Sequence, residues 1–92
     1  MLKVDKLKRT CEACPSQWEG SLSDGRKLYV RYRWGVLSAR VSKEPSSDIM
    51  TAVDGEEVVS SAVGEPLDGY MTFREMRELV SHKIDLSGII PE

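Results

Sequence analysis

Residues 27–41 read KLYVRYRWGVLSARV, and this stretch decides the fold. Its apolar and polar residues alternate with the period of two that is typical of a β-strand with one buried face. Gly35 interrupts the alternation, so the stretch predicts two antiparallel strands that meet at Trp34 and Gly35. The apolar face carries Leu28, Val30, Tyr32, Trp34, Leu37, Ala39 and Val41. The opposite face carries Lys27, Tyr29, Arg31, Arg33 and Arg40.

The register of these two strands follows from burial. If Tyr32 lies opposite Leu37, every further pair along the ladder joins two apolar residues, so one face is buried throughout. A connecting loop of two or four residues is compatible with this register. Because tryptophan is a poor residue for positive φ, we expect the four-residue loop.

A second hairpin is predicted just before this one, with a strand from residue 16 to residue 22 and a turn signal at residues 23–25. A two-residue loop would place three polar side chains in the core, at a cost of several kcal/mol. A three-residue loop with Gly25 in the left-handed conformation pairs Trp18 with Val30 and keeps the indole inside. We therefore expect the three-residue loop and a buried Trp18.

The segments on either side of the meander are less regular. Residues 1–14 form a basic lead-in, with a short strand expected at Leu2–Leu7. Residues 44–71 are acidic, and both Asp48–Val53 and Glu57–Val63 have the composition of strands. The same residues are compatible with short helices, because Ser47 is a fair N-cap; we expect strands.

A helix is predicted at residues 72–87. Thr72 and Glu75 have the spacing of a capping box, in which each residue satisfies a backbone N–H of the other. The residues that share one apolar helical stripe are Phe73, Met76, Leu79, Val80 and Ile84. Residues 1–92 are thus expected to form a single α+β domain, an antiparallel meander of three to five strands (residues 16–42 at its centre) with one C-terminal helix packed on it.

Charge is divided unevenly along the chain. Residues 1–43 hold ten Lys/Arg and four Asp/Glu, a net of +6, whereas residues 44–92 hold three and eleven, a net of −8. No apolar run approaches the 18 residues of a membrane span, and the basic start is not followed by the apolar stretch of a signal peptide. We expect a cytoplasmic protein, with the two halves either facing different partners or neutralising each other.

The residues with catalytic or metal-binding potential are few. Cys11 and Cys14 form a CxxC pair, but a structural zinc site needs four ligands, and the single histidine, His82, is distant in the sequence. No nucleophile, base and orienting group occur together, and no glycine-rich segment has the ending of a phosphate-binding loop. We therefore expect reduced cysteines, no metal, no cofactor and no enzymatic activity.

The stretches CPSQWEG (residues 14–20), DGR (24–26) and YVRYRWG (29–35) resemble a group of small uncharacterised bacterial and bacteriophage proteins. The resemblance covers roughly residues 11–42. It implies a bacterial or phage source and no particular chemistry.

The outward face of the meander is the candidate binding site, with Lys27, Tyr29, Arg31, Arg33 and Arg40 as the contact residues. Arginine and tyrosine are favoured anchors of protein interfaces, so we expect an adaptor or small inhibitor that binds an acidic protein surface. The alternative function is nucleic-acid binding, because cations and an aromatic ring on a sheet can follow a phosphate backbone. A third interpretation is a solvated sheet face with no partner.

Overall fold

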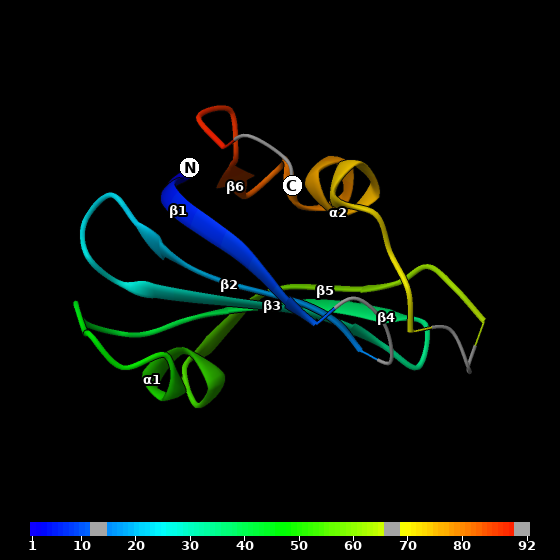
Figure 1. The fold of residues 1–92 in the computed structure, drawn as a ribbon, viewed down its shortest axis with the longest axis horizontal. Coiled ribbons are helices and arrows are strands. Elements are labelled where there is room, and N and C mark those ends of the chain that lie inside the picture. Colours follow the sequence, from blue (N-terminus) through cyan, green and yellow to red (C-terminus); the bar gives the residue numbers. More distant parts are fainter. Residues whose placement is uncertain (12–14, 66–68, 90–92) are drawn as a thin grey trace.

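The computed structural model describes residues 1–11, 15–65 and 69–89. It contains a strongly curled, six-stranded sheet in the order β5-β4-β3-β2-β1-β6, with helices α1 and α2 on opposite sides of it (Figure 1). The elements in chain order are β1 (Leu2–Cys11), β2 (Ser16–Leu22), β3 (Lys27–Arg33), β4 (Val36–Val41), α1 (Met50–Val53), β5 (Glu56–Ala62), α2 (Phe73–Val80) and β6 (Ile84–Asp85).

The registers of the β2–β3–β4 meander agree with the sequence-based prediction. Trp18 lies opposite Val30, and Tyr32 lies opposite Leu37. The first hairpin has the expected three-residue loop, in which the backbone N–H of Leu22 donates to the Arg26 carbonyl at 2.8 Å and Gly25 has φ +92°. Burial of one face therefore selected the register of both hairpins, as the alternation of the sequence predicts.

The second hairpin corrects the predicted loop length. Arg33 pairs with Val36, which leaves a two-residue turn of Trp34 (φ 57°) and Gly35 (φ 72°). Positive φ at both central residues matches the right-handed twist of the flanking strands, so the ladder continues up to the turn. The four-residue loop was thus a wrong prediction, and so was the position of Trp34 on the apolar face, since Trp34 lies in the turn and not in a strand.

The predicted basic lead-in is another correction, because its residues Leu2–Cys11 form the ten-residue strand β1, antiparallel to β2, and residues 12–14 lie outside the described residues. The expected strand at Leu2–Leu7 is only its first part. A register shift between Val4 and Lys6 places Val4 and Leu7 on the same side of the sheet, although they are an odd number of residues apart. This irregularity breaks the sequence alternation, which is why the strand looked short.

The described part of the acidic segment, residues 44–65 and 69–71, contains the helix α1 and the strand β5. Met50–Val53 is the short helix α1, so the strand expected at Asp48–Val53 was wrong. The Asp48 side chain accepts a hydrogen bond from the Met50 backbone N–H at 3.0 Å, and the Thr51 hydroxyl donates to the Asp48 carbonyl at 2.6 Å. These local bonds favour a helical turn over an extended chain. The second predicted strand exists as β5, one residue earlier than expected.

Helix α2 begins as predicted and ends early. The capping box of Thr72 and Glu75 is present. The helix stops at Val80 instead of residue 87, and Ile84 then pairs with Leu2 as part of a short strand parallel to β1. The sheet is therefore mixed, not purely antiparallel, and has one strand more than the range expected from the sequence.

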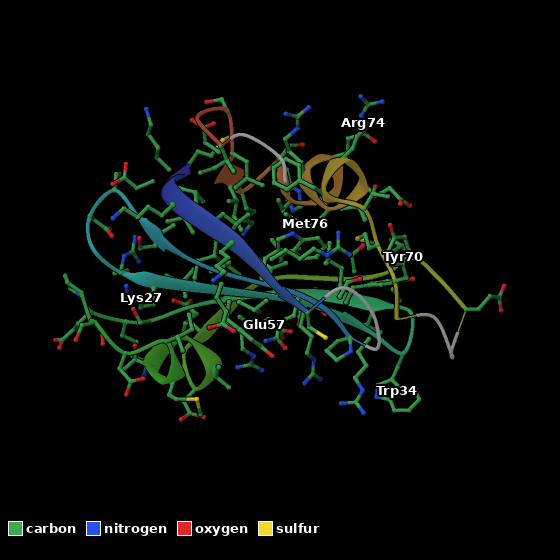
Figure 2. The ribbon with its side chains drawn as sticks, viewed as in Figure 1. Lys27, Trp34, Glu57, Tyr70, Arg74 and Met76 are labelled. Atoms are coloured by element: carbon green, nitrogen blue, oxygen red, sulfur yellow. The ribbon has the colours of Figure 1, made fainter. Side chains whose placement is uncertain are left out.

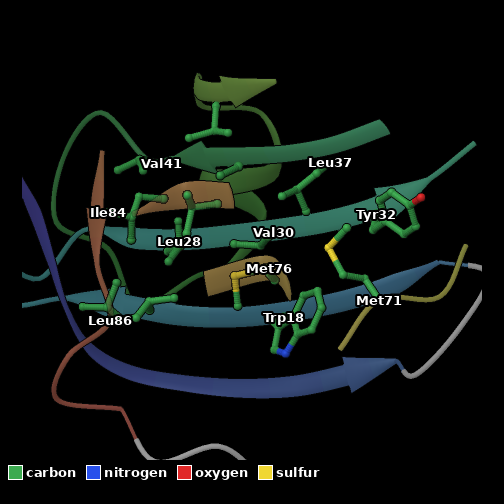
Figure 3. Packing of buried hydrophobic residues seen from close by; sticks show 14 of the residues in the cluster. Trp18, Leu28, Val30, Tyr32, Leu37, Val41, Met71, Met76, Ile84 and Leu86 are labelled. Carbon is green, nitrogen blue, oxygen red and sulfur yellow. The ribbon is translucent and has the colours of Figure 1, made fainter. Parts of the chain in front are cut away.

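The main core lies between the sheet and α2 (Figure 3). Its buried residues are Val4, Trp18, Leu22, Leu28, Val30, Tyr32, Leu37, Ala39, Val41, Val59, Met71, Met76, Val80, Ile84 and Leu86. The predicted burial of Trp18 is confirmed, because only 2% of its surface is exposed. Ala52 is also fully buried but lies outside this core, since α1 packs on the other face of β3 and β4.

One arginine ties the segment before α2 to the sheet. The Arg9 guanidinium donates to the Met71 carbonyl at 2.7 Å and to the Ser16 hydroxyl at 3.0 Å, and it lies 4.8 Å from the centre of the Trp18 ring. The Ser16 hydroxyl also accepts a hydrogen bond from the Met71 backbone N–H at 2.8 Å. These contacts hold residues 69–71 against the start of β2.

Candidate interaction surface

The face of the sheet that carries α1 is polar, and we call it the outer face. Helix α1 has only four residues and covers only part of it (Figure 1). The part next to the β3–β4 turn forms an open hollow between the end of α1 and the strands. The residues that line this hollow are Tyr29, Arg31, Arg33, Trp34, Val36, Ser38, Arg40, Val53, Asp54 and Glu57.

The structure brings together four of the five residues predicted as the site. Tyr29, Arg31, Arg33 and Arg40 all line the hollow. Lys27 does not, because it lies at the far end of β3 from the turn, as Figure 2 shows. There it borders a separate depression together with Lys6, Glu19 and residues 47–49.

Two of the four residues form the floor of the hollow. Tyr29 donates its hydroxyl proton to the Gln17 side-chain oxygen at 2.8 Å. Arg40 donates from Nη1 to the Gly55 carbonyl at 3.0 Å and lies between Tyr29 and Glu57 in the register of the sheet. Both side chains are half-buried. Their hydrogen bonds hold them in place, so they shape the surface more than they reach out from it.

The other two arginines are better placed to contact a partner. Arg31 lies between Gln17 and Ser38 in register, with no acidic residue directly opposite, and Arg33 is exposed at the end of β3. Between residues that the structure describes, the ion pair found is that of Arg26 with Asp24, on a different turn. The guanidinium groups of Arg31 and Arg33 therefore remain available for carboxylates of another molecule.

Sequence reasoning missed Trp34, which was assigned to the apolar face. Its side chain is 57% exposed at the tip of the β3–β4 turn, and that of the neighbouring Val36 is 37% exposed. The Arg33 guanidinium lies 5.0 Å from the centre of the indole ring. Arg31, Arg33, Trp34 and Val36 together form what we call the turn patch. A Trp-Gly pair at a turn position that favours Asn-Gly was the signal that could have identified it.

Acidic residues limit the positive charge of the outer face. Glu57 and Asp54 line the hollow itself, and Glu19 lies opposite Tyr29 on β2. The surface is thus one of mixed charge with two available arginines, and not a continuous basic stripe.

The carboxyl groups with shifted pKa values lie elsewhere. The backbone N–H of Arg26 donates to Asp24 and holds the pKa of that carboxyl below its ordinary value of 3.8, and the Arg26 guanidinium acts in the same direction. The hydroxyl and backbone N–H of Ser87 lower the pKa of Asp85 in the same way. Asp24 is an exposed turn residue and Asp85 is the half-buried last residue of β6, so both shifts belong to local structure.

The structure describes only some of the residues that the sequence offers for metal binding or catalysis. Cys11 ends β1, but Cys14 lies outside the described residues. In the described ranges, His, Cys, Asp and Glu side chains do not gather in groups of three or more that could hold a metal ion. His82 is exposed in the turn after α2. None of the described helices has the length and apolar character needed to cross a membrane.

Comparisons of the chain with protein-family models, with curated proteins and with solved structures found no match.

Proposed function

We propose that this chain is a non-enzymatic interaction module, an adaptor or a small inhibitor, that binds an acidic surface of another protein in the cytoplasm. The observation that carries the proposal is the pair of available arginines, Arg31 and Arg33, on a rigid sheet beside an exposed tryptophan. Arginine, tryptophan and tyrosine are the residue types most enriched at the energetic centres of protein interfaces. The hydrogen-bonded floor of Tyr29 and Arg40 keeps this surface preorganised, which lowers the entropy cost of binding.

The mixed charge of the surface favours a protein over a nucleic acid. A phosphate chain that crossed the hollow would meet the carboxylates of Asp54 and Glu57. The hydroxyl group of Tyr29 is bonded to Gln17, so its half-buried ring is not presented to a base. The net charge of −2 also opposes nonspecific attraction of polyanions.

Nucleic-acid binding is the second candidate, and one observation favours it. The exposed Trp34 ring with Arg33 beside it is a surface on which an unpaired base can stack. This function requires that short single-stranded oligonucleotides bind with micromolar affinity. Phosphate binding through the four cations of the predicted site would weaken steeply with salt, with a log–log slope of about −3 for single strands.

The test compares two double charge reversals. Arg31→Glu/Arg33→Glu alters the outer face, whereas Arg74→Glu/Arg77→Glu makes the same change in net charge on α2, where both arginines are exposed. Bacterial lysate treated with nuclease is passed over each immobilised variant, and any captured protein is purified and titrated against the same variants. We expect a net-acidic protein that binds the wild type and the α2 variant equally and the outer-face variant at least about tenfold more weakly.

Equal binding of the purified protein to all three chains would contradict the proposed surface. Micromolar binding of an oligonucleotide that is lost in the outer-face variant alone would establish the second candidate in its place.

A further inference from the structure

Trp34 has a backbone conformation that its residue type does not favour. Its φ of 57° lies in the left-handed region, where side chains other than glycine, asparagine and aspartate are strained. Among the described residues, Trp34 is the one residue other than glycine with a positive φ. Asparagine before Gly35 would satisfy the same turn without strain. The identity of residue 34 is therefore not explained by the turn.

The side chain of Trp34 is not explained by packing either. More than half of the surface of Trp34 is exposed, and the residue is absent from the buried core, in contrast with Trp18. In Figure 2 the Trp34 side chain projects from the end of the molecule, away from the core and on the side of the sheet opposite α2. A strained residue that buries little apolar surface adds little to folding, and such residues cluster at binding sites.

The turn that carries Trp34 is held by hydrogen bonds from the segment that follows β5. The Gly35 carbonyl accepts hydrogen bonds from the backbone N–H groups of Val63 at 3.0 Å and Gly64 at 3.1 Å. The backbone of the turn approaches that segment so closely that a Cβ atom on Gly35 would lie 2.5 Å from the Gly64 carbonyl oxygen. The backbone that carries the indole is thus held in place, which reduces the entropy lost when a partner covers Trp34.

We propose that Trp34 is the anchor of the interface and packs against apolar side chains of the partner protein, with carboxylates of that protein beside them pairing with Arg33 and Arg31. This inference rests on the proposed function and adds to it the chemistry of the partner site. The charge on the turn patch specifies the carboxylates, because Arg33 lies over the Trp34 ring and opposite Val36 in the register, and Arg31 lines the same hollow. The apolar contact is specified by the exposed Trp34 and Val36.

A second copy of the chain is the nearest competing occupant. A hollow lined by Tyr70, Leu79, Glu75 and Glu78 combines aromatic, apolar and acidic groups. It lies beside α2, however, whereas Trp34 lies on the α1 side of the sheet (Figure 2). Insertion of Trp34 into this hollow would join two different surfaces, and contacts of that kind produce rings or open-ended chains instead of a simple pair. A different protein is therefore the favoured occupant.

The experiment uses a library of random 12-residue peptides displayed on phage as the probe. The full chain is the bait, and the Trp34→Asn variant is used for counter-selection, because asparagine accepts the left-handed conformation and leaves the turn intact. We expect enriched peptides that place an aromatic or aliphatic residue next to Asp or Glu. A synthetic peptide of this kind should bind Trp34→Asn at least about tenfold more weakly than the wild type, and Arg33→Glu similarly. It should also protect the indole of Trp34 from iodide quenching, a signal that Trp18 does not give because it is buried.

Several results would overturn the anchor. The peptides could bind Trp34→Asn as well as they bind the wild type while Arg31→Glu/Arg33→Glu loses them; then the outer face binds acidic proteins, but Trp34 is not its anchor. If no peptide is enriched, or only basic peptides are, the partner chemistry is wrong. If a single-stranded oligonucleotide quenches Trp34 at micromolar concentration, the ring stacks on bases. If the mass in sedimentation rises with concentration for the wild type and not for Trp34→Asn, the occupant is a second copy.

Discussion

The two tryptophans of this chain each contact an arginine, but one is buried and the other is exposed. Each has an arginine guanidinium over its ring, Arg9 at 4.8 Å from the centre of Trp18 and Arg33 at 5.0 Å from that of Trp34. Trp18 is 2% exposed and central to the core, whereas Trp34 is 57% exposed at a turn. A cation–π pair contributes about 0.5–1 kcal/mol at an exposed site and about 2 kcal/mol when desolvated. The same pair of residue types can therefore stabilise a fold or be left available to a partner.

The surroundings of each arginine explain the difference. The Arg9 guanidinium donates to the Met71 carbonyl and the Ser16 hydroxyl, so it joins the segment before α2 to β2. Arg33 is exposed beside the turn. We infer that the region of Trp18 is organised for stability and that of Trp34 for recognition.

The largest expected effect is that of Trp18→Ala. Removal of a fully buried indole from a packed core should lower the free energy of unfolding by about 3–5 kcal/mol. The matched variant Trp34→Ala should change it by less than about 0.5 kcal/mol, because little packing is lost at an exposed site. Urea unfolding followed by far-ultraviolet circular dichroism compares the two. If both variants lose a similar amount of unfolding free energy, the proposed contrast between the two regions is wrong.

The next effect concerns the arginines. Arg9→Met removes the charged donor from the Met71 carbonyl and the Ser16 hydroxyl, and the expected loss is about 2 kcal/mol in the free energy of unfolding. Arg33→Met keeps a similar stem at an exposed position and should cost less than about 0.5 kcal/mol. The same urea titrations measure both. A neutral Arg9→Met would show that the contacts of Arg9 are incidental to stability.

A smaller effect is expected when the support of the Trp34 turn is disturbed. Gly35→Ala places a side chain at φ 72° and against the Gly64 and Glu65 carbonyls, so a loss of about 1–2 kcal/mol is expected from the left-handed backbone alone. Gly88→Ala is the control, because a Cβ atom there meets nothing within 4 Å. Thermal unfolding of the two variants decides the matter: if Gly35→Ala is as stable as Gly88→Ala, the turn is not held firmly.

Burial explains which parts of the fold could be predicted from the sequence. Alternation at residues 27–41 and the capping box at Thr72 are local signals with strong energetic consequences, and the structure confirms the registers and the helix start. Strand β1 was underestimated, because its register shift near Asp5 disrupts the alternation. The short strand β6 has two residues and depends on a distant partner, Leu2, so no local pattern indicates it.

The sequence predicted most residues of the candidate site but neither the position of α1 nor that of Trp34. Alternation placed Tyr29, Arg31, Arg33 and Arg40 on one face, and these four residues line one hollow. It could not show that helix α1 would cover part of that face and leave Lys27 in a separate depression. The position of Trp34 was missed for a physical reason. The rule that tryptophan avoids positive φ predicts a longer loop, and the exception to that rule is the most informative residue of the surface.

The stability of Trp34→Asn is the measurement that tests the central claim most directly. If residue 34 serves recognition at the expense of local strain, the substitution should leave the free energy of unfolding unchanged or raise it by up to about 1 kcal/mol, since asparagine suits a left-handed turn position. Urea unfolding of the two chains at equal concentration measures the difference. A loss of more than about 1 kcal/mol would show that the indole stabilises the fold, and the contrast between the two tryptophans would not hold.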